Sequence, residues 1–455
     1  MRAIVSLFIV VVLAVGVVWI WPRLESDPPV LAGPERIELG AGERQIDVAW
    51  EDPGMGLAEV TAVLRLPGTP GDDAPREIVL HEKRLRSNRP GDPIGRDTEE
   101  RQTLVLDAAR LELPDGESTL VLRARDASWS GFGEGNAAEV EIPVVVDTKP
   151  PRVSIESGIT YVRRGGAALL AYRVDADAER SGVRVGDAFF PGWRDPSGRF
   201  VAIFGIPVEA AEQPRVEVVG IDAFGNETAL PFDARIRERT PPEISIALSD
   251  GFLDRVDRTF RSGDDAAGAT ALAVFQRVNT DLRARNDALI AETIPEPTEA
   301  AWSGAFEQMR GSKVTSQFAE LRHYTQRGRR VSRARHYGYD LASTSRAPIT
   351  ASNAGTVLFA GDNGIYGNLV LIDHGLGITT LYGHLSSLEV GVGDRVTKGQ
   401  VLGRSGATGL AGGDHLHFAV LVGQTYVDPL EWWDPKWIRD HITSRLDAGG
   451  ADPDA

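Results

Sequence analysis

The chain has 455 residues, more than the roughly 250 that one hydrophobic core usually supports, so several domains are expected. Its formal net charge of −16 argues against nucleic acid as the main partner, because a polyanion is attracted by a basic surface. The sequence has no cysteine, which excludes disulfides, thiol nucleophiles and thiolate metal sites, so any metal must be bound by His, Asp or Glu.

The first predicted element is an uncharged apolar run at residues 3–21, about as long as the roughly 20 residues that a membrane helix needs. A cleaved signal peptide is the alternative, but its apolar region usually has about 7 to 15 residues and precedes small residues, whereas Trp21 and Pro22 end this run. We therefore predict a transmembrane anchor at residues 1–24. A basic residue precedes the run and acidic residues follow it, which predicts a single-pass protein of the inner membrane with the bulk of the chain in the periplasm.

Short alternating segments broken by Gly, Pro and Asp follow the anchor and predict two immunoglobulin-like β-sandwiches, at residues 30–147 and 148–247. A weak internal repeat supports two modules, because Asp126 and Asn136 recur in similar contexts as Asp222 and Asn226. Its period of roughly ninety residues is about the size of one such domain. No cluster of catalytic residues stands out here, so these modules are interpreted as spacers or as a docking surface for a protein partner.

A helical connector is predicted at residues 248–310, where apolar residues recur at helical spacing between about 266 and 292. Trp302 and Phe306 are placed on a second short helix. We hypothesise that the connector packs against the following domain and restricts access to its site. The expected contact residues are Leu272, Phe275, Val278, Leu282 and Leu289.

Six of the eight histidines lie between His323 and His417. An HxxxD pair, His336 with Asp340, is weak evidence alone, because such pairs more often make surface hydrogen bonds. The His-Leu-His element is stronger, since alternate residues of a strand share a face and would project His415 and His417 together. A structural histidine pair is the alternative.

A fifth polar residue, His384, lies in the segment Tyr382-Gly-His-Leu-Ser. Zinc favours imidazole nitrogen and carboxylate oxygen, and a catalytic zinc typically has three protein ligands. Four histidines and one aspartate exceed that number, and the surplus suits proton transfer and oxyanion stabilisation in a hydrolase.

With these motifs, residues 311 to about 437 resemble the M23 family of zinc peptidases, the lysostaphin and LytM type, which implies an antiparallel β domain followed by a tail at residues 438–455. Supporting segments occur in order at residues 314–318, 340–342, 354–357, 367–368, 373–375, 393–400 and 427–429. The resemblance implies one zinc per chain, bound by His336, Asp340 and His417. It assigns acid/base and oxyanion-stabilising roles to His384 and His415. One departure is Ala419, where many members have Glu.

The resemblance also implies a function, namely a zinc-dependent endopeptidase that hydrolyses peptide cross-links of bacterial peptidoglycan through a zinc-activated water. One alternative is a non-enzymatic, LytM-like activator of cell-wall amidases, against which the intact five-residue set argues. Another is a lipoyl-like carrier, suggested by residues 393–400, but no Asp-Lys pair marks an attachment lysine. The expected partners are peptidoglycan and, through the N-terminal helix, the inner membrane, with no nucleic acid.

Overall fold

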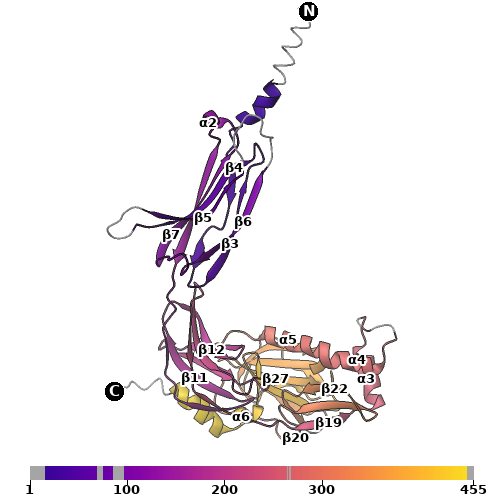
Figure 1. Cartoon of the computed structure of the whole chain (residues 1–455). Helices are drawn as coiled ribbons and strands as arrows, with labels where there is room; N and C mark the ends of the chain where they lie inside the picture. Colours follow the sequence, from indigo (N-terminus) through magenta and orange to yellow (C-terminus); the bar gives the residue numbers. More distant parts are fainter. Residues whose placement is uncertain (1–15, 69–74, 86–96, 264, 266–267, 448–455) are drawn as a thin grey trace, which may run out of the picture. The chain divides into compact units, whose positions relative to one another are not determined.

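The computed structural model describes residues 16–68, 75–85, 97–263, 265 and 268–447, and β-strands dominate it, as the sequence predicts (Figure 1). The chain divides into two compact units. The first comprises Met1–Pro150 with Ile221–Glu227, and the second comprises Pro151–Gly220 with Thr228–Ala455.

The predicted anchor at residues 1–24 lies largely outside the described residues, which begin at residue 16. Within the described ranges, no helix combines the length and the apolar character that crossing a membrane requires. Helical structure near this end includes the 3-10 turn η1, Trp21–Leu24. The membrane location therefore stays a prediction.

The first unit contains two β-sheets whose inward-facing side chains form one core. Alternate residues of a strand point to opposite faces, so Trp50 and Leu64 are fully buried while Glu51 and Arg65, the next residues along their strands, are more exposed. The five-stranded sheet has the order β2 (Ile37–Leu39), β8 (Ala137–Val146), β7 (Gly116–Asp126), β4 (Leu57–Leu66) and β5 (Arg76–Arg84). The three-stranded sheet has the order β1 (Val30–Ala32), β3 (Glu43–Glu51) and β6 (Glu99–Asp107), and the short α2 is Ser130–Gly133.

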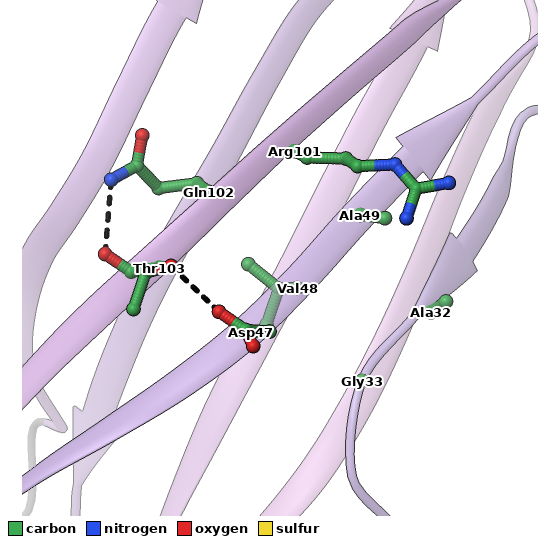
Figure 2. A pocket seen from close by; sticks show the side chains of 8 residues that line it. All are labelled: Ala32, Gly33, Asp47, Val48, Ala49, Arg101, Gln102 and Thr103. Atoms are coloured by element: carbon green, nitrogen blue, oxygen red, sulfur yellow. Dashed lines mark hydrogen bonds between the residues drawn. The ribbon is translucent and has the colours of Figure 1, made fainter. Parts of the chain in front are cut away.

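A cavity of about 550 Å³ opens on the three-stranded sheet, between the end of β1 and the strands β3 and β6. Figure 2 shows its polar side chains engaged with one another: the Thr103 hydroxyl donates to the Asp47 carboxylate at 2.6 Å, and the Gln102 amide donates to the Thr103 carbonyl. Arg101 forms ion pairs with Glu99 and Glu51. Each of these four polar side chains therefore has at least one polar partner.

The internal repeat corresponds to the same hydrogen-bonded arrangement twice. The Asp126 carboxylate accepts from the backbone N–H and the side-chain amide of Asn136, both at 2.7 Å. Asp222 accepts in the same way from the backbone and side chain of Asn226, both at 2.8 Å. The Asn226 amide also donates to the Asp147 carbonyl at 2.7 Å, which ties the second copy to the segment that ends β8.

The second unit begins with two four-stranded sheets and a two-stranded parallel ribbon. Their shared core includes Tyr172, Phe190 and Phe204. One sheet has the order β14 (Trp193–Arg194), β15 (Phe200–Gly205), β11 (Ala167–Val174) and β9 (Val153–Ile155). The other has the order β13 (Ala188–Pro191), β12 (Ala178–Val185), β16 (Val216–Asp222) and β17 (Glu227–Pro231), and the ribbon joins β10 (Thr160–Arg163) to β18 (Ala234–Arg237).

The connector contains the helix that the sequence predicts, interrupted by one π-helical turn. Its elements are α3 (Asp250–Phe260), α4 (Ala271–Arg277), the π turn η2 (Val278–Leu282) and α5 (Arg283–Thr293). Phe275 and Val278 are fully buried, as expected for contact residues, whereas Leu272 and Leu282 are partly buried.

Two expectations for the connector are wrong. Leu289 is 42% exposed, because it projects from the outer face of α5 rather than toward the core. Trp302 and Phe306 lie on an extended segment without helix, held by backbone hydrogen bonds from Ala301 to His374 and from Phe306 to Trp432. Both aromatic side chains are buried against Trp432, so core packing accounts for them.

An eight-stranded sheet forms the centre of the domain that follows. Its path is β20 (Lys313–Ser316), β23 (Tyr339–Ala342), β31 (Leu416–Val422), β27 (Ile378–Leu385), β26 (Asn368–Asp373), β25 (Gly355–Asp362) and β29 (Arg395–Val396), with β32 (Thr425–Val427) beside β31. Two small sheets accompany it, β19 (Glu243–Ala247) with β21 (Leu321–Gln326) and β22 (Arg329–Arg335), and β24 (Pro348–Thr350) with β30 (Val401–Arg404) and β28 (Ser387–Leu388). The 3-10 turn η3 is Gly364–Tyr366.

The two faces of this sheet are covered differently. On β31, Leu416 and Phe418 belong to the large core shared with the preceding sheets. Ala419 and Leu421 instead belong to the cluster formed with Phe275 and Ile290 of the connector. Ala419, the one departure from the family pattern, is therefore packed among apolar side chains.

Residues 438–447, at the start of the predicted tail, are helical and packed. They follow α6 (Pro429–Trp433) and α7 (Pro435–Ile438) as the π turn η4 (Arg439–Thr443) and α8 (Ser444–Asp447). Ile442 is fully buried, and the Arg445 guanidinium donates to the Leu169 carbonyl of β11 at 3.1 Å. The chain after residue 437 therefore helps to join the eight-stranded sheet to the sheet that contains β11.

Candidate metal centre

Three neighbouring strands bring the candidate residues together. Asp340 of β23 lies opposite His417 of β31, and His417 in turn lies opposite Gly383 of β27. His384 follows Gly383, and His415 immediately precedes β31 at an isolated bridge to Gly406. Period-two alternation along this segment thus places His415 and His417 on the same side, as predicted from the sequence.

His336, Asp340 and His417 form a triangle of potential ligand atoms. His336 Nε2 lies 2.9 Å from Asp340 Oδ1 and 3.0 Å from His417 Nδ1, and the latter two atoms are 3.0 Å apart. His336 Nδ1 donates to the Gln317 carbonyl at 2.9 Å, so its Nε2 is the atom left with a lone pair. All three residues are buried.

The donor set fits zinc. Two imidazole nitrogens and one carboxylate oxygen are ligands that zinc favours, and three protein ligands leave a further position for water or substrate. Three such atoms at about 3 Å from one another, in a buried site, are stabilised by a cation or by shared protons. The hydrogen bond from His336 Nδ1 to a backbone carbonyl is the kind of outer contact that orients metal-binding histidines.

Asp340 is kept ionised by its neighbours. Burial by itself raises its pKa, but His336, His415 and His417 together hold the pKa of this carboxyl well below its usual range. Its second oxygen, Oδ2, accepts from Arg322 Nη2 at 2.7 Å. The guanidinium of Arg322 also donates to Ser316 Oγ, which fixes it on β21 beside the site.

His384 and His415 lie at the edge of the triangle. Their ring centroids are 4.8 Å apart, and His415 Nε2 is 3.5 Å from Asp340 Oδ1. His384 Nδ1 donates to the Thr408 carbonyl and His415 Nδ1 donates to the Gly413 carbonyl, so each has its Nε2 available for other partners. Burial, reinforced by the charges of His415 and His417, lowers the pKa of His384 to about 3.

The backbone of His384 adopts a left-handed conformation, with φ of 65°. A non-glycine residue in this region is uncommon and carries a cost, and such residues gather at functional sites. The structure therefore marks His384 independently of its histidine side chain.

The connector borders the site. The site cavity has a volume of about 100 Å³, and its lining comprises Arg283, Arg322, Tyr324, His336, Asp340, Ile365, Tyr366, His384, Leu410, Gly412, His415 and His417. Arg283 belongs to α5, and its guanidinium is held by Asn279 of η2. A connector side chain thus lies in the same cavity as the candidate ligands.

Hydrogen bonds attach the connector to both walls of that cavity. On one side, Gln276 donates to the Val331 carbonyl of β22 at 2.8 Å, near Tyr324 of β21. On the other side, Arg255 donates to the Ala411 carbonyl at 2.8 Å, and Asn286 accepts from the Ile365 N–H at 2.9 Å. The connector therefore packs beside the cavity, and restricted access stays a prediction.

Sequence reasoning missed the roles of Arg322, Arg283 and Tyr366. Strands β21 and β22 form a hairpin, and Arg322 of β21 forms an ion pair with Asp340. Tyr366 lies with its ring centroid 5.7 Å from that of His417 and donates to Asp287 of α5. The local sequence does not predict these contacts, because they depend on how distant segments pair and pack.

Comparison with known proteins gives the class of this domain. Residues 334–429 match the family model described as peptidase family M23. The DD-carboxypeptidase/endopeptidase Mpg of Neisseria meningitidis serogroup B is 40% identical over 95 residues, which are 21% of this chain and 22% of that protein. The peptidoglycan DD-endopeptidase ShyB of Vibrio cholerae serotype O1 is 35% identical over 119 residues, 26% of this chain and 27% of that protein.

Among solved structures, the catalytic domain of lysostaphin from Staphylococcus simulans is 29% identical and matches 28% of this chain and 96% of that chain, with a TM-score of 0.24. The family match confirms the resemblance seen in the sequence: the chain carries a peptidase family M23 domain at residues 334–429. The chain spans about a quarter of the length of the curated relatives it matches, 22% and 27% for the two above.

Proposed function

We propose that the chain is a zinc-dependent endopeptidase that hydrolyses peptide cross-links of bacterial peptidoglycan. The observation that carries this proposal is the convergence of His336 Nε2, Asp340 Oδ1 and His417 Nδ1 in a family M23 domain. The names of the two relatives, both endopeptidases, support this reaction class, and that of ShyB supports the substrate. We propose that the bond hydrolysed is a cross-link of the D,D type.

His336, Asp340 and His417 would hold the zinc. When bound, zinc supplies a Lewis acid that activates water near neutral pH and polarises a carbonyl oxygen. Arg322 keeps Asp340 in place through its second carboxylate oxygen, so that Oδ1 stays directed to the site. The hydrogen bond from His336 to Gln317 has the same orienting effect on the imidazole.

His384 and His415 would move protons and stabilise the developing oxyanion. Each imidazole is oriented by donation from Nδ1 to a backbone carbonyl, which leaves Nε2 to accept or donate a proton. Such groups contribute about 10²- to 10⁴-fold to rate. A non-enzymatic activator of amidases would not require this set.

We also propose that residues 1–24 anchor the chain in the inner membrane and that the modules at 30–147 and 148–247 are immunoglobulin-like spacers in the periplasm, with a surface for protein partners. The apolar run at 3–21 and the repeated Asp–Asn arrangement support this proposal. Protease treatment of intact spheroplasts tests it: digestion of the domain around His417 is expected, and protection of that domain would contradict a periplasmic location.

Digestion of purified peptidoglycan tests the enzymatic function. We expect the wild-type chain to convert cross-linked muropeptides to monomers, identified by mass, and His384→Ala to leave them intact. If muropeptide dimers persist with the zinc-loaded wild-type protein while an added amidase becomes more active, the endopeptidase function is contradicted and the activator function is favoured.

A further inference from the structure

A second groove lies in the same compact unit, where the β10–β18 ribbon meets the helices α6 and α7. The ribbon is parallel, with Tyr161 opposite Arg235 and Arg163 opposite Arg237. All four residues are exposed, because they occupy the alternate positions that point away from the core. Their face forms one wall of a cavity of about 510 Å³.

Two of the three arginines on this face form no ion pair within the part of the chain that the structure describes. Arg235 forms an ion pair with Asp233 at 2.9 Å, whereas neither Arg163 nor Arg237 forms an ion pair within the described residues. Like charges on neighbouring strands repel each other. An anion that bridges both guanidinium groups would relieve this repulsion. A carboxylate suits the role, because its two oxygens can accept two parallel hydrogen bonds from one arginine.

Aromatic side chains flank the arginines. Tyr161 is 56% exposed, and the Arg237 guanidinium lies 5.2 Å from its ring centroid. On the opposite wall, Trp437 of α7 stacks on His441 with 5.1 Å between ring centroids. Such rings offer flat apolar faces together with a polar tip, which suits a ligand that is part sugar and part charged group.

The carboxylates of the opposite wall are engaged elsewhere. Asp428 forms an ion pair with Arg239, and Asp434 accepts from the Lys436 N–H as the cap of α7. Glu431 accepts from the Ala167 N–H at 2.9 Å, and burial raises its pKa to about 8, so it is mostly protonated near neutral pH. None of these three carboxylates forms an ion pair with Arg163 or Arg237.

We propose that this groove binds a carboxylate-bearing sugar–peptide fragment of the cell wall, with its carboxylate on Arg163 and Arg237 and its sugar ring against Tyr161 and Trp437. The volume lies within the roughly 300 to 1,000 Å³ typical of small-ligand sites. The choice of a wall fragment, rather than another carboxylated glycan, rests on the proposed function. None of the residues that line the site cavity lines this groove, so the wall would be held at a second point, which raises effective affinity without a new catalytic contact.

Calorimetric titration of the full-length, zinc-loaded protein with a soluble disaccharide that carries a tripeptide tests the proposal. This probe has no cross-link, so its binding is separate from turnover. We expect the Arg163→Gln, Arg237→Gln double variant to bind at least about tenfold more weakly, the usual scale for losing charge-assisted hydrogen bonds worth about 1.5 kcal/mol or more. Tyr161→Ala, at an exposed position, is expected to weaken binding several-fold without altering thermal stability.

Arg235→Gln is the matched control, because it removes the same charge from the same ribbon at a residue that already has an acidic partner. Unchanged affinity in the double variant, or an equal loss in Arg235→Gln, would overturn the proposal. If the probe binds as expected while cross-linked peptidoglycan is not cleaved, the groove stands and the proposed function fails. If cross-linked peptidoglycan is cleaved but probe binding does not depend on Arg163 and Arg237, the proposed function stands and the groove proposal fails.

Discussion

His384 and His415 lie beside the three proposed metal ligands, and each donates from Nδ1 to a backbone carbonyl. Because neither belongs to the closely spaced ligand triangle, we predict that His384→Ala and His415→Ala retain zinc. Each should lose at least about a hundredfold in rate, the scale for removing an acid/base or oxyanion group. Elemental analysis and initial rates on a cross-linked peptide measure both quantities, and loss of metal in either variant would mean that a ligand has been mistaken for a catalytic residue.

Arg322 is the partly buried partner of the proposed ligand Asp340. Replacing Arg322 with Gln removes the cation at Asp340 Oδ2, so we predict zinc affinity about 10 to 100 times lower, as is usual when an outer contact of a metal ligand is lost. Competition with a chelator measures this affinity. Arg330→Gln is the control, since Arg330 is an exposed arginine of the same hairpin. Equal zinc affinity in Arg322→Gln and the wild type would show that Asp340 needs no such support.

The candidate ligands were predictable from sequence while their supports were not. His415 and His417 alternate along one chain segment, so local periodicity alone predicts a shared face, as the structure has it. Arg322 reaches Asp340 only because the β21–β22 hairpin returns the chain to β23, and the left-handed backbone of His384 has no counterpart in composition. Contacts that depend on pairing between strands leave no local signal.

Among the elements, the connector helix was predictable from the sequence, but the π turn within it was not. Helical spacing of apolar residues predicts a helix near 266–292, and α4 to α5 runs from Ala271 to Thr293. The π turn at Val278–Leu282 shifts the face that follows it, which explains why Phe275 is buried but Leu289 is not. A single helical period cannot anticipate such a shift.

The connector yields a test of restricted access at Arg283. This side chain lines the site cavity, so Arg283→Ala should enlarge the opening and raise the rate of cross-linked peptide cleavage several-fold, with zinc content unchanged. Arg285→Ala, at an exposed position of the same helix, serves as the control. A slower Arg283→Ala enzyme would contradict occlusion and would instead indicate that Arg283 binds substrate.

Helix α6, which follows the eight-stranded sheet, contacts the turn between β10 and β11 through Glu431. Its carboxyl accepts from the Ala167 N–H, and a Cβ at Gly166 would lie 2.5 Å from Glu431 Oε1, so a side chain at position 166 would displace this carboxyl. Burial raises the pKa of Glu431 from 4.5 to about 8. Folding is therefore favoured by the protonated form, and this contribution falls as pH rises from about 4.5 through 8.

We predict that Glu431→Gln reduces that pH dependence. The amide oxygen can still accept from Ala167, and no charge develops on burial, so the variant should gain in melting temperature relative to the wild type at pH 8 but not at pH 5. Glu389→Gln, at an exposed glutamate, should show no such difference. A difference in melting temperature that is the same at both pH values would contradict the assignment.

At the scale of the whole molecule, composition and turn spacing correctly predict a mainly β chain, and the Asp–Asn repeat appears as the same hydrogen-bonded arrangement in two places. The packed helix at residues 438–447 could not be predicted, because its partners are distant in sequence: Arg445 donates to Leu169, 276 residues away. Burial supplied by such a remote partner is invisible to any local pattern.

The zinc content of the purified soluble region, together with its activity, tests the central claim most directly. The account predicts one zinc per chain in the wild type, no stoichiometric zinc and no peptidoglycan cleavage in His417→Ala, and recovery of wild-type activity when zinc is restored after chelation. A His417→Ala protein that retains one zinc per chain and full activity would contradict it.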